Sequence, residues 1–271
     1  MSKTAIYFTI IIIILIVLLA LYFVYMNSTS NYPTTINNNP AQTSTTSNTI
    51  KLGSSASLGS FLIDANGKTL YYFANDINGK SNCTGVCSTI WKPFYASNII
   101  VPSDLNVTDF GQITNIAGTN QTTYKGWPLY YYSGDNNSGD TNGQSVQNIW
   151  FVASSPFYNV LLMNNTNSKT YLSNVNGEAL YYFKSDTRGS STTDPVSKCT
   201  GTCLNTWTIF DQSQVVAPVF LSASDFTKFT RVDNTTQLAY KGYPLYLYSG
   251  DTQSGDIKGD GLNKLWYLVK P

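Results

Sequence analysis

Two hydrophobic patterns divide the chain. The first is Ala5–Met26, an apolar run of 22 residues without a charge. As an α-helix this run is about 33 Å long, which is enough to cross the hydrocarbon core of a bilayer. After it, apolar residues come in short β-prone segments separated by Asn-Gly and Lys-Gly pairs, without a convincing helical period. The pattern therefore predicts an N-terminal transmembrane helix over residues 1–26, followed by an all-β protein.

The charges that flank the apolar run predict its orientation. Lys3 is the only charge before it, and the next basic residue is Lys51. We therefore expect a single-pass protein of the cell membrane with its domains outside the cytoplasm (N-in, C-out). A cleaved signal peptide is the alternative, but it would have a shorter apolar core and a small-residue cleavage site, neither of which is evident. Residues 27–55 are rich in Ser, Thr and Asn, so we expect a stalk there.

The remaining chain repeats itself. Leu70–Phe73 recurs as Leu180–Phe183, and Tyr124–Tyr130 recurs as Tyr240–Tyr246. The offset is 110 residues at the first pair and 116 at the second, so one insertion of about six residues near 191–197 explains the change. A long fixed period indicates two copies of one folded unit. We therefore predict two tandem homologous β domains, 56–155 and 156–271, built from hairpins and sandwich- or barrel-like.

Turn residues locate the hairpins within each copy. Asn66-Gly67 and its counterpart Asn176-Gly177 favour type I′ turns, which need two residues with positive φ. Lys125-Gly126 and Lys241-Gly242 are further predicted turns. The prolines that follow them cannot donate to a β-ladder, so they belong at a strand start or on a sheet edge.

One motif occurs four times, twice in each copy. It reads Tyr-x-aromatic-x-x-Asp, and its two rings share one face of a strand because side chains alternate along a strand. The first interpretation is that the rings form core and that the Asp accepts backbone N–H groups at the strand end. The second is that rings and carboxylates line a ligand surface. The residues concerned are Tyr71, Phe73, Asp76, Tyr130, Tyr132, Asp135, Tyr181, Phe183, Asp186, Tyr246, Tyr248 and Asp251.

These segments resemble a family of secreted repeats and lipoproteins that carry a Tyr-x4-Asp motif. The resemblance covers residues 58–154 and 168–270, and it also rests on the Lys-Gly-x-Pro-Leu-Tyr turns, the Cys-Thr-Gly-x-Cys segments, Trp91, Trp150 and Trp266. It implies an exported surface protein and transfers no catalytic residue, because members have no established biochemical activity. Phe151 and Tyr267 stand where the family often has His, and a membrane helix stands where it often has a lipid anchor.

The four cysteines form two Cys-x3-Cys pairs. One helical turn brings two Cα atoms about 6 Å apart, within reach of a disulfide, and disulfides are the usual state outside the cytoplasm. We therefore expect structural bridges Cys83–Cys87 and Cys199–Cys203, one in each copy. The alternative is a redox pair or a Cu(I) site, since thiolates suit a soft ion.

Asp- and Gly-rich loops follow the second motif of each copy. Asp135, Asp140, Asp251 and Asp256 are weak candidates for calcium, which prefers clustered oxygen ligands. The spacing is not that of an EF-hand loop, and Asp and Gly are also common at ordinary turns. Apart from these weak alternatives, we expect no cofactor and no metal.

Composition narrows the function further. The chain has no histidine, a net charge of +1 and only 11% charged residues, so neither a His-based catalytic dyad nor nucleic-acid binding is indicated. We expect no enzyme activity. The sequence favours an anchored surface module with a structural or binding role toward a glycan, the cell envelope or another protein. The alternative is an exported redox or copper-handling protein that uses the cysteine pairs.

Overall fold

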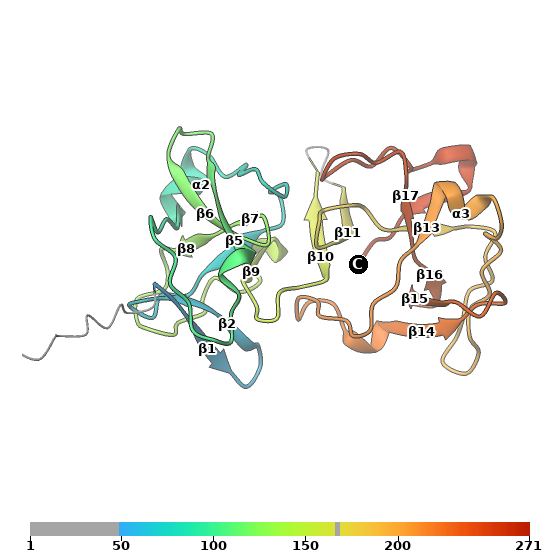
Figure 1. The fold of residues 1–271 in the computed structure, drawn as a ribbon, viewed down its shortest axis with the longest axis horizontal. Helices are drawn as coiled ribbons and strands as arrows, with labels where there is room; N and C mark the ends of the chain where they lie inside the picture. Colours follow the sequence, from blue (N-terminus) through green and yellow to red (C-terminus); the bar gives the residue numbers. More distant parts are fainter. Residues whose placement is uncertain (1–48, 166–168) are drawn as a thin grey trace, which may run out of the picture. The chain divides into compact units, whose positions relative to one another are not determined.

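The computed structural model describes residues 49–165 and 169–271, a mostly β chain (Figure 1). The predicted transmembrane helix and most of the predicted stalk lie outside the described residues. Within them, none of the helices has the length and apolar character required to span a membrane.

The first repeat consists of short strands with one helical turn near its cysteines. Its elements are β1 (Ile50–Ser55), β2 (Gly59–Asp64), β3 (Tyr71–Phe73), α2 (Val86–Ile90), β4 (Trp91–Pro93), η1 (Val107–Asp109), β5 (Phe110–Thr114), β6 (Asn120–Tyr124), β7 (Trp127–Pro128), β8 (Tyr130–Tyr132), η2 (Val146–Asn148) and β9 (Trp150–Val152).

The second repeat has the same elements in the same order. They are β10 (Val160–Asn164), β11 (Thr170–Asn174), β12 (Tyr181–Phe183), α3 (Cys203–Thr206), β13 (Trp207–Ile209), η3 (Ala223–Asp225), β14 (Phe226–Thr230), β15 (Thr236–Tyr240), β16 (Tyr243–Pro244), β17 (Tyr246–Tyr248), η4 (Leu262–Lys264) and β18 (Trp266–Leu268).

A four-stranded antiparallel sheet lies at the centre of each repeat. Its strand order is β4-β8-β3-β9 in the first repeat and β13-β17-β12-β18 in the second. A two-stranded hairpin and a three-stranded sheet accompany each central sheet. All six sheets in the described chain are open, so the barrel-like alternative is wrong. The strands are two to six residues long, and each belongs to one small sheet.

Each repeat is itself made of two halves. Strands β1–β4 form one half and strands β5–β9 form the other. Each half begins with a hairpin, continues to a strand that begins with the motif tyrosine, and ends with a strand that begins with Trp91 or Trp150. Tyr71 of β3 and Tyr130 of β8 are direct partners in the antiparallel register. The second repeat pairs Tyr181 with Tyr246 in the same way. The four halves span approximately 50–95, 110–154, 160–211 and 226–270.

The turn at Asn66-Gly67 is present but differs from the predicted type. Gly67 and Gly177 have φ values of 84° and 77°, whereas neither Asn66 nor Asn176 has a positive φ, so the type I′ prediction is wrong at both Asn-Gly turns. The side chain of Asp64 closes the turn in place of a second residue with positive φ. Its Oδ1 accepts the N–H groups of Asn66 and Lys68 at 2.9 and 2.8 Å. Strand β2 pairs mainly with β1 and has only the single bridge Ile63–Thr69 toward β3.

The Lys-Gly turns agree with the prediction. Lys125 and Gly126 have φ values of 49° and 85°, and the turn joins β6 to β7. Lys241 and Gly242 repeat the conformation with 48° and 79°. The following prolines lie on β7 and β16, each an edge strand of its three-stranded sheet, which is where a residue without an N–H is tolerated.

The folded region begins earlier than expected. Strand β1 starts at Ile50, which is fully buried and donates its backbone N–H to the carbonyl of Ile100 at 3.2 Å. Residues 50–55 were predicted as the end of the stalk, and that prediction is wrong. The segment mixes Lys, Gly and Ser with two apolar residues, so its own pattern is weak, and pairing with β2 determines its conformation.

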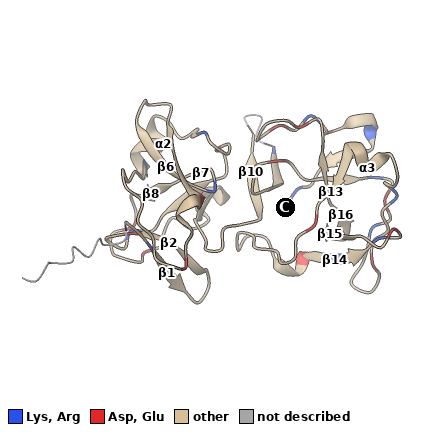
Figure 2. Cartoon of the chain, in the orientation of Figure 1, with Lys and Arg blue, Asp and Glu red and all other residues tan. Residues whose placement is uncertain are grey.

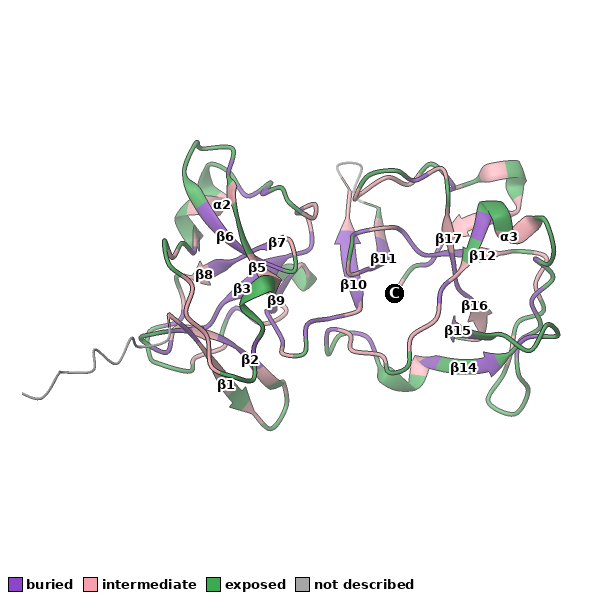
Figure 3. Ribbon diagram, viewed as in Figure 1, coloured by how far each residue is buried: buried purple, intermediate pink, exposed green. Residues whose placement is uncertain are grey.

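Buried residues occur in the strands of both repeats (Figure 3). One continuous cluster extends from Ile50 to Val269 and so includes residues of both repeats. The indole Nε1 of Trp127 donates to the carbonyl of Val175 at 2.8 Å, and the N–H of Asn78 donates to Ser254 Oγ at 3.0 Å. The two repeats therefore share packing and hydrogen bonds.

Candidate functional site

The four motif tyrosines are fully buried, and each one hydrogen-bonds the aspartate of the other motif in its repeat. Tyr71 donates to Asp135 Oδ2 at 2.7 Å, and Tyr130 donates to Asp76 Oδ2 at 2.7 Å. The second repeat has the same exchange, with Tyr181 donating to Asp251 at 2.6 Å and Tyr246 donating to Asp186 at 2.8 Å.

The antiparallel register explains this exchange of partners. Because Tyr71 lies opposite Tyr130, the loop that leaves the end of one strand comes back beside the start of the other. Lys68 Nζ, just before β3, donates to the carbonyl of Asp135 at 2.7 Å and holds that loop in place. The aspartate is therefore near the neighbouring tyrosine rather than near its own.

The second oxygen of each motif aspartate accepts a backbone N–H. The donors are Asn82 for Asp76, Asn142 for Asp135, Lys198 for Asp186 and Lys258 for Asp251, at 2.7 to 2.9 Å. The expected role in closing the loop after the strand is thus observed. The hydrogen bond from the tyrosine of the other motif was not expected.

Burial changes the acidity of these groups. Desolvation raises the pKa of Asp76 to about 8, although the N–H of Asn82 and the hydroxyl of Tyr130 oppose the shift. Desolvation also raises the pKa of Asp135, Asp186 and Asp251 above the usual range. Burial, together with the neighbouring carboxylates, keeps the motif tyrosines protonated as donors.

In each repeat, the second ring of each motif and two tryptophans form a stack beside the motif tyrosines. In the first repeat the order is Phe73, Trp150, Trp91 and Tyr132, with centroid distances of 4.0, 3.8 and 4.3 Å. The two tryptophans are parallel, with an interplanar angle of 0°. The second repeat stacks Phe183, Trp266, Trp207 and Tyr248 at 4.3, 3.7 and 4.5 Å.

The structure therefore places the twelve motif residues at the centre of the two repeats. Rings packed on both sides and carboxylates with two donors each act as a framework for the central sheets. Only Tyr132, Phe183, Asp186 and Tyr248 among them are partly exposed. As a set they have little surface to offer a ligand.

Both cysteine pairs form disulfides within their own repeat, as predicted. The Cα atoms are 5.3 Å apart in Cys83–Cys87 and in Cys199–Cys203. All four sulfurs are used in these bridges, so the thiolates that the copper alternative needs are not present in this form. The bridges hold the helical turns that precede Trp91 and Trp207.

The calcium candidates use their oxygens within their own loops. Asp140 Oδ2 accepts the N–H groups of Asn136 and Asn137 at 2.9 and 2.8 Å. Asp256 Oδ2 accepts two equivalent N–H groups and contacts Lys258 Nζ at 2.6 Å. Within residues 49–165 and 169–271, three or more His, Cys, Asp or Glu side chains do not gather into a metal site.

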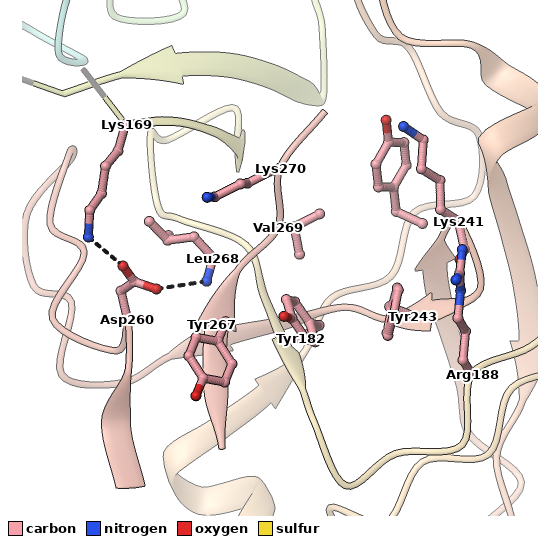
Figure 4. Close-up of a pocket in the computed structure, with 11 residues that line it drawn as sticks. Lys169, Tyr182, Arg188, Lys241, Tyr243, Asp260, Tyr267, Leu268, Val269 and Lys270 are labelled. Atoms are coloured by element: carbon pink, nitrogen blue, oxygen red, sulfur yellow. Dashed lines mark hydrogen bonds and ion pairs between the residues drawn. The ribbon is translucent and has the colours of Figure 1, made fainter. Parts of the chain in front are cut away.

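A cleft in the second repeat was not predicted. It has a volume of about 450 Å³, and a row of three tyrosines, Tyr267, Tyr182 and Tyr243, lies along it (Figure 4). The ring of Tyr182 is 5.8 Å from that of Tyr267 and 4.9 Å from that of Tyr243. All three rings are partly exposed.

Basic side chains occupy both ends of the tyrosine row (Figure 4). Lys169 lies at one end and pairs with Asp260 at 2.6 Å. Arg188 lies at the other end, with its guanidinium 4.7 Å from the Tyr243 ring and its Nε donating to the carbonyl of Lys241 at 2.9 Å. These residues come from separate segments of a chain whose charged positions are sparse (Figure 2).

The first repeat has an aromatic trio at the same three positions, but there it is covered. Tyr72 contacts Trp127 and Phe151 at 5.8 and 5.6 Å, and all three are fully buried. Phe157 and Tyr158, from the segment between the repeats, pack against Tyr72 at 5.8 and 5.6 Å.

Aligning the two repeats shows how the cleft differs from its covered counterpart. The basic lining residues Lys169, Arg188 and Lys270 correspond to Gly59, Asn78 and Ser154 of the first repeat. Two rings also differ, since Tyr243 and Tyr267 replace Trp127 and Phe151. The sequence signal for the cleft is therefore the set of positions at which the second repeat has a charge or a hydroxyl and the first repeat does not.

Comparison with known proteins agrees with the half-repeat organisation. Residues 54–95, 111–154 and 227–270 each match one family, which is described as a secreted repeat of unknown function. These segments coincide with the first, second and fourth halves; the third half, which carries the insertion and Arg188, is not among them. No curated protein and no solved structure shows significant similarity to the chain. The resemblance inferred from the motifs is confirmed: three of the four halves of this chain match the secreted repeat of unknown function.

Proposed function

We propose that this protein is a non-catalytic binding module outside the cytoplasm, and that the cleft of the second repeat is its ligand surface. The observation that carries the proposal is the contrast between the two aromatic trios. The same three positions are buried in the first repeat and open in the second, where they carry hydroxyls and basic neighbours. Tyrosine combines a large contact area with a polar tip, which suits a surface that binds reversibly.

The state of the buried carboxylates supports a role without catalysis. Each motif aspartate is held by a tyrosine hydroxyl and by a backbone N–H, away from the cleft lining. Asp260 is the one carboxylate of the lining, and it is held by Lys169 and by the N–H of Leu268 at 3.2 Å. A binding surface needs none of these carboxylates to change protonation.

The location proposed for the module is the outer face of a membrane. Secreted repeats match the chain, and both cysteine pairs are oxidised, which suits a compartment outside the cytoplasm. The apolar run Ala5–Met26 would serve as the anchor. The partner expected at such a position is a glycan, the cell envelope or another surface protein.

The binding role is tested by co-sedimentation. Purified full-length protein in non-ionic detergent is mixed with the envelope fraction of the producing cell, and the bound fraction is measured. Tyr267→Ala removes one ring of the cleft and should lower binding about tenfold or more, as loss of a central aromatic contact does.

Tyr95→Ala is the matched control for this experiment. Tyr95 is 42% exposed in the first repeat and lies outside the cleft, so its removal should leave binding unchanged. Equal binding by wild type and the Tyr267→Ala variant, with both proteins folded, would contradict the proposal.

A further inference from the structure

We propose that the tyrosine cleft of the second repeat binds an acidic polysaccharide, meaning a chain of sugar rings that carry carboxylate or sulfate groups. This inference rests on the proposed binding function and specifies the ligand class of the same site. Three features carry it: the row of tyrosines, the cations around the row, and the absence of three of these four cations from the covered counterpart.

The tyrosine row fits sugar rings. Three adjacent rings, with centroids 4.9 and 5.8 Å apart and planes tilted by 46° and 30°, form an extended aromatic surface. The faces of such rings pack against the C–H face of a pyranose, and their hydroxyls exchange hydrogen bonds with sugar hydroxyls. A platform of Trp, Tyr and Phe, as in the first repeat, lacks two of these three hydroxyls and is packed against protein instead.

The cations fit a negative charge on the sugar. Lys169, Arg188, Lys241 and Lys270 contribute four positive charges to the lining, and Asp260 contributes the one negative charge. Asp260 is already paired with Lys169, and Lys241 has only a long contact of 4.0 Å to Asp225. Neither Arg188 nor Lys270 pairs with a carboxylate of the described chain. The cleft therefore has positive charge available for an anionic ligand.

Arg188 is already positioned for such a ligand. Its Nε is fixed by the carbonyl of Lys241 and its guanidinium lies over the Tyr243 ring. This leaves the two terminal nitrogens to face a carboxylate or sulfate, the geometry in which Arg binds oxyanions with two parallel hydrogen bonds. The insertion near 191–197 that distinguishes the third half follows shortly after Arg188, and just before it the N–H of Gly189 donates to the carbonyl of Gly242 at 2.8 Å.

The location of the cations argues against a generally basic surface. Their counterparts in the first repeat are Gly59, Asn78, Lys125 and Ser154, so three of the four positive charges occur only where the aromatic trio is open. The chain as a whole carries a net charge of only +1. Positive charge and exposed tyrosines are thus concentrated together at one site.

The test measures binding of oligogalacturonate to purified full-length protein by calorimetry, with the methyl ester of the same oligosaccharide as a ligand control. The ester keeps the sugar rings and loses the charge. Dextran sulfate and neutral dextran form a second matched pair, which distinguishes sulfate from carboxylate as the charged group. Polyglutamate supplies carboxylates without sugar rings.

We expect at least one acidic polysaccharide to bind, with an affinity that falls as salt is added, while its neutral partner and polyglutamate bind about tenfold more weakly or not at all. The double variant Arg188→Asn and Lys270→Ser should weaken binding about tenfold, because it removes two charges by introducing the residues of the first repeat. The control variant Lys184→Ala and Lys198→Asn removes two exposed charges outside the cleft, again with first-repeat residues, and should bind normally.

Several results would overturn the inference. Equal binding of the methyl ester would remove the need for charge, and equal binding of polyglutamate would remove the need for sugar. Unchanged affinity in the Arg188→Asn and Lys270→Ser variant would place the ligand elsewhere. If neither acidic polysaccharide binds while the Tyr267→Ala variant still loses envelope binding, the proposed ligand class is wrong and the proposed binding function stands. If the Tyr267→Ala variant binds the envelope as well as wild type does, the proposed binding function is wrong.

Discussion

The hydroxyl of Tyr71 donates a hydrogen bond to Oδ2 of Asp135, a residue of the other motif in its repeat, at a distance of 2.7 Å. The pair is buried, and Gly143 N–H approaches the same tyrosine oxygen at 3.3 Å. The Tyr-x4-Asp spacing therefore does not describe a local contact. It describes two halves of a domain that hold each other, and each half supplies one donor and one acceptor.

The first prediction concerns the energetic coupling of this pair. Tyr71→Phe should cost about 1–3 kcal/mol of unfolding free energy, because it leaves Asp135 Oδ2 without its donor in a buried position. Asp135→Asn should cost a similar amount. In a double-mutant cycle measured by urea denaturation, the two changes should be less than additive.

The pair Tyr71 and Asp76 is the control for this cycle. These residues belong to the same motif but do not hydrogen-bond each other, so Tyr71→Phe combined with Asp76→Asn should be closer to additive. Additive costs for Tyr71 and Asp135 would show that the observed hydrogen bond does not couple them.

The second prediction concerns the rings themselves. Tyr71→Ala and Tyr181→Ala should each cost about 3–5 kcal/mol, as truncation of a large buried aromatic does. Both rings are fully buried on the central strands β3 and β12. Denaturant midpoints equal to that of the wild type in both variants would show that the rings do not form core.

The third prediction concerns pH. The pKa of Asp76 is about 8 in the folded protein and near 3.8 when the chain is unfolded, so the folded state binds an extra proton between these values. Stability should therefore be fully present at low pH and fall as pH rises toward 8, by at most about 1.4 kcal/mol per pH unit from this group. Raised pKa values of Asp135, Asp186 and Asp251 act in the same direction.

Asp76→Asn checks the assignment. Its side chain cannot titrate, and Tyr130 retains Ser81 Oγ as an acceptor at 2.7 Å, so the variant should fold. Urea denaturation at pH 5.5 and at pH 7.5 should show a smaller difference in unfolding free energy for this variant than for the wild type. An identical pH dependence in the two proteins would assign the effect to other groups.

The fourth prediction concerns Arg231, which is 4% exposed. The first repeat has no arginine at the corresponding position. It donates to Ser197 Oγ at 2.7 Å, to the carbonyl of Cys199 at 2.6 Å and to Gln237. Arg231→Ala should cost about 3–5 kcal/mol, because it leaves buried acceptors without donors. The exposed Lys228→Ala should cost less than about 1 kcal/mol, and equal losses in thermal melts would contradict the distinction.

The fifth prediction concerns topology. With an N-in, C-out span over Ala5–Met26, protease added to intact cells should release both repeats by cutting between residues 27 and 49. Immunoblotting of the supernatant for the C-terminal repeat measures the release. Full protection of that repeat in intact cells, but not in lysed cells, would place the domains inside.

Much of the fold could be predicted because the sequence contains two copies of the same folded unit. The duplicated tyrosine strands, Lys-Gly turns and cysteine pairs each carry a strong local signal, and the structure has all of them. Strand β1 could not be predicted in this way, because Lys51 and Gly53 interrupt its apolar pattern and its conformation depends on pairing with β2. The type of the Asn66-Gly67 turn depends on the carboxylate of Asp64, which the dipeptide rule does not consider.

The site was harder to predict than the fold because it depends on distant pairings. The partner of Tyr71 lies 64 residues away and is determined by the register of β3 against β8. In the cleft, Arg188 and Lys270 are isolated cations in the sequence, and only the fold brings them to the same row of tyrosines. The residues around Arg188 or Lys270 in the sequence do not indicate that the two cations lie near the tyrosines. A comparison of the two repeats does indicate it.

The crossed bonds between tyrosines and aspartates also limit how such a chain can change in length. A half-domain by itself would expose one tyrosine that has lost its acceptor and one carboxylate that has lost its donor, together with half of an aromatic stack. Gain or loss of halves should therefore occur in even numbers, with a tandem of whole pairs as the viable product. The same reasoning makes the loop between β4 and β5 a place where the chain could be cut and the two pieces would still need each other to fold.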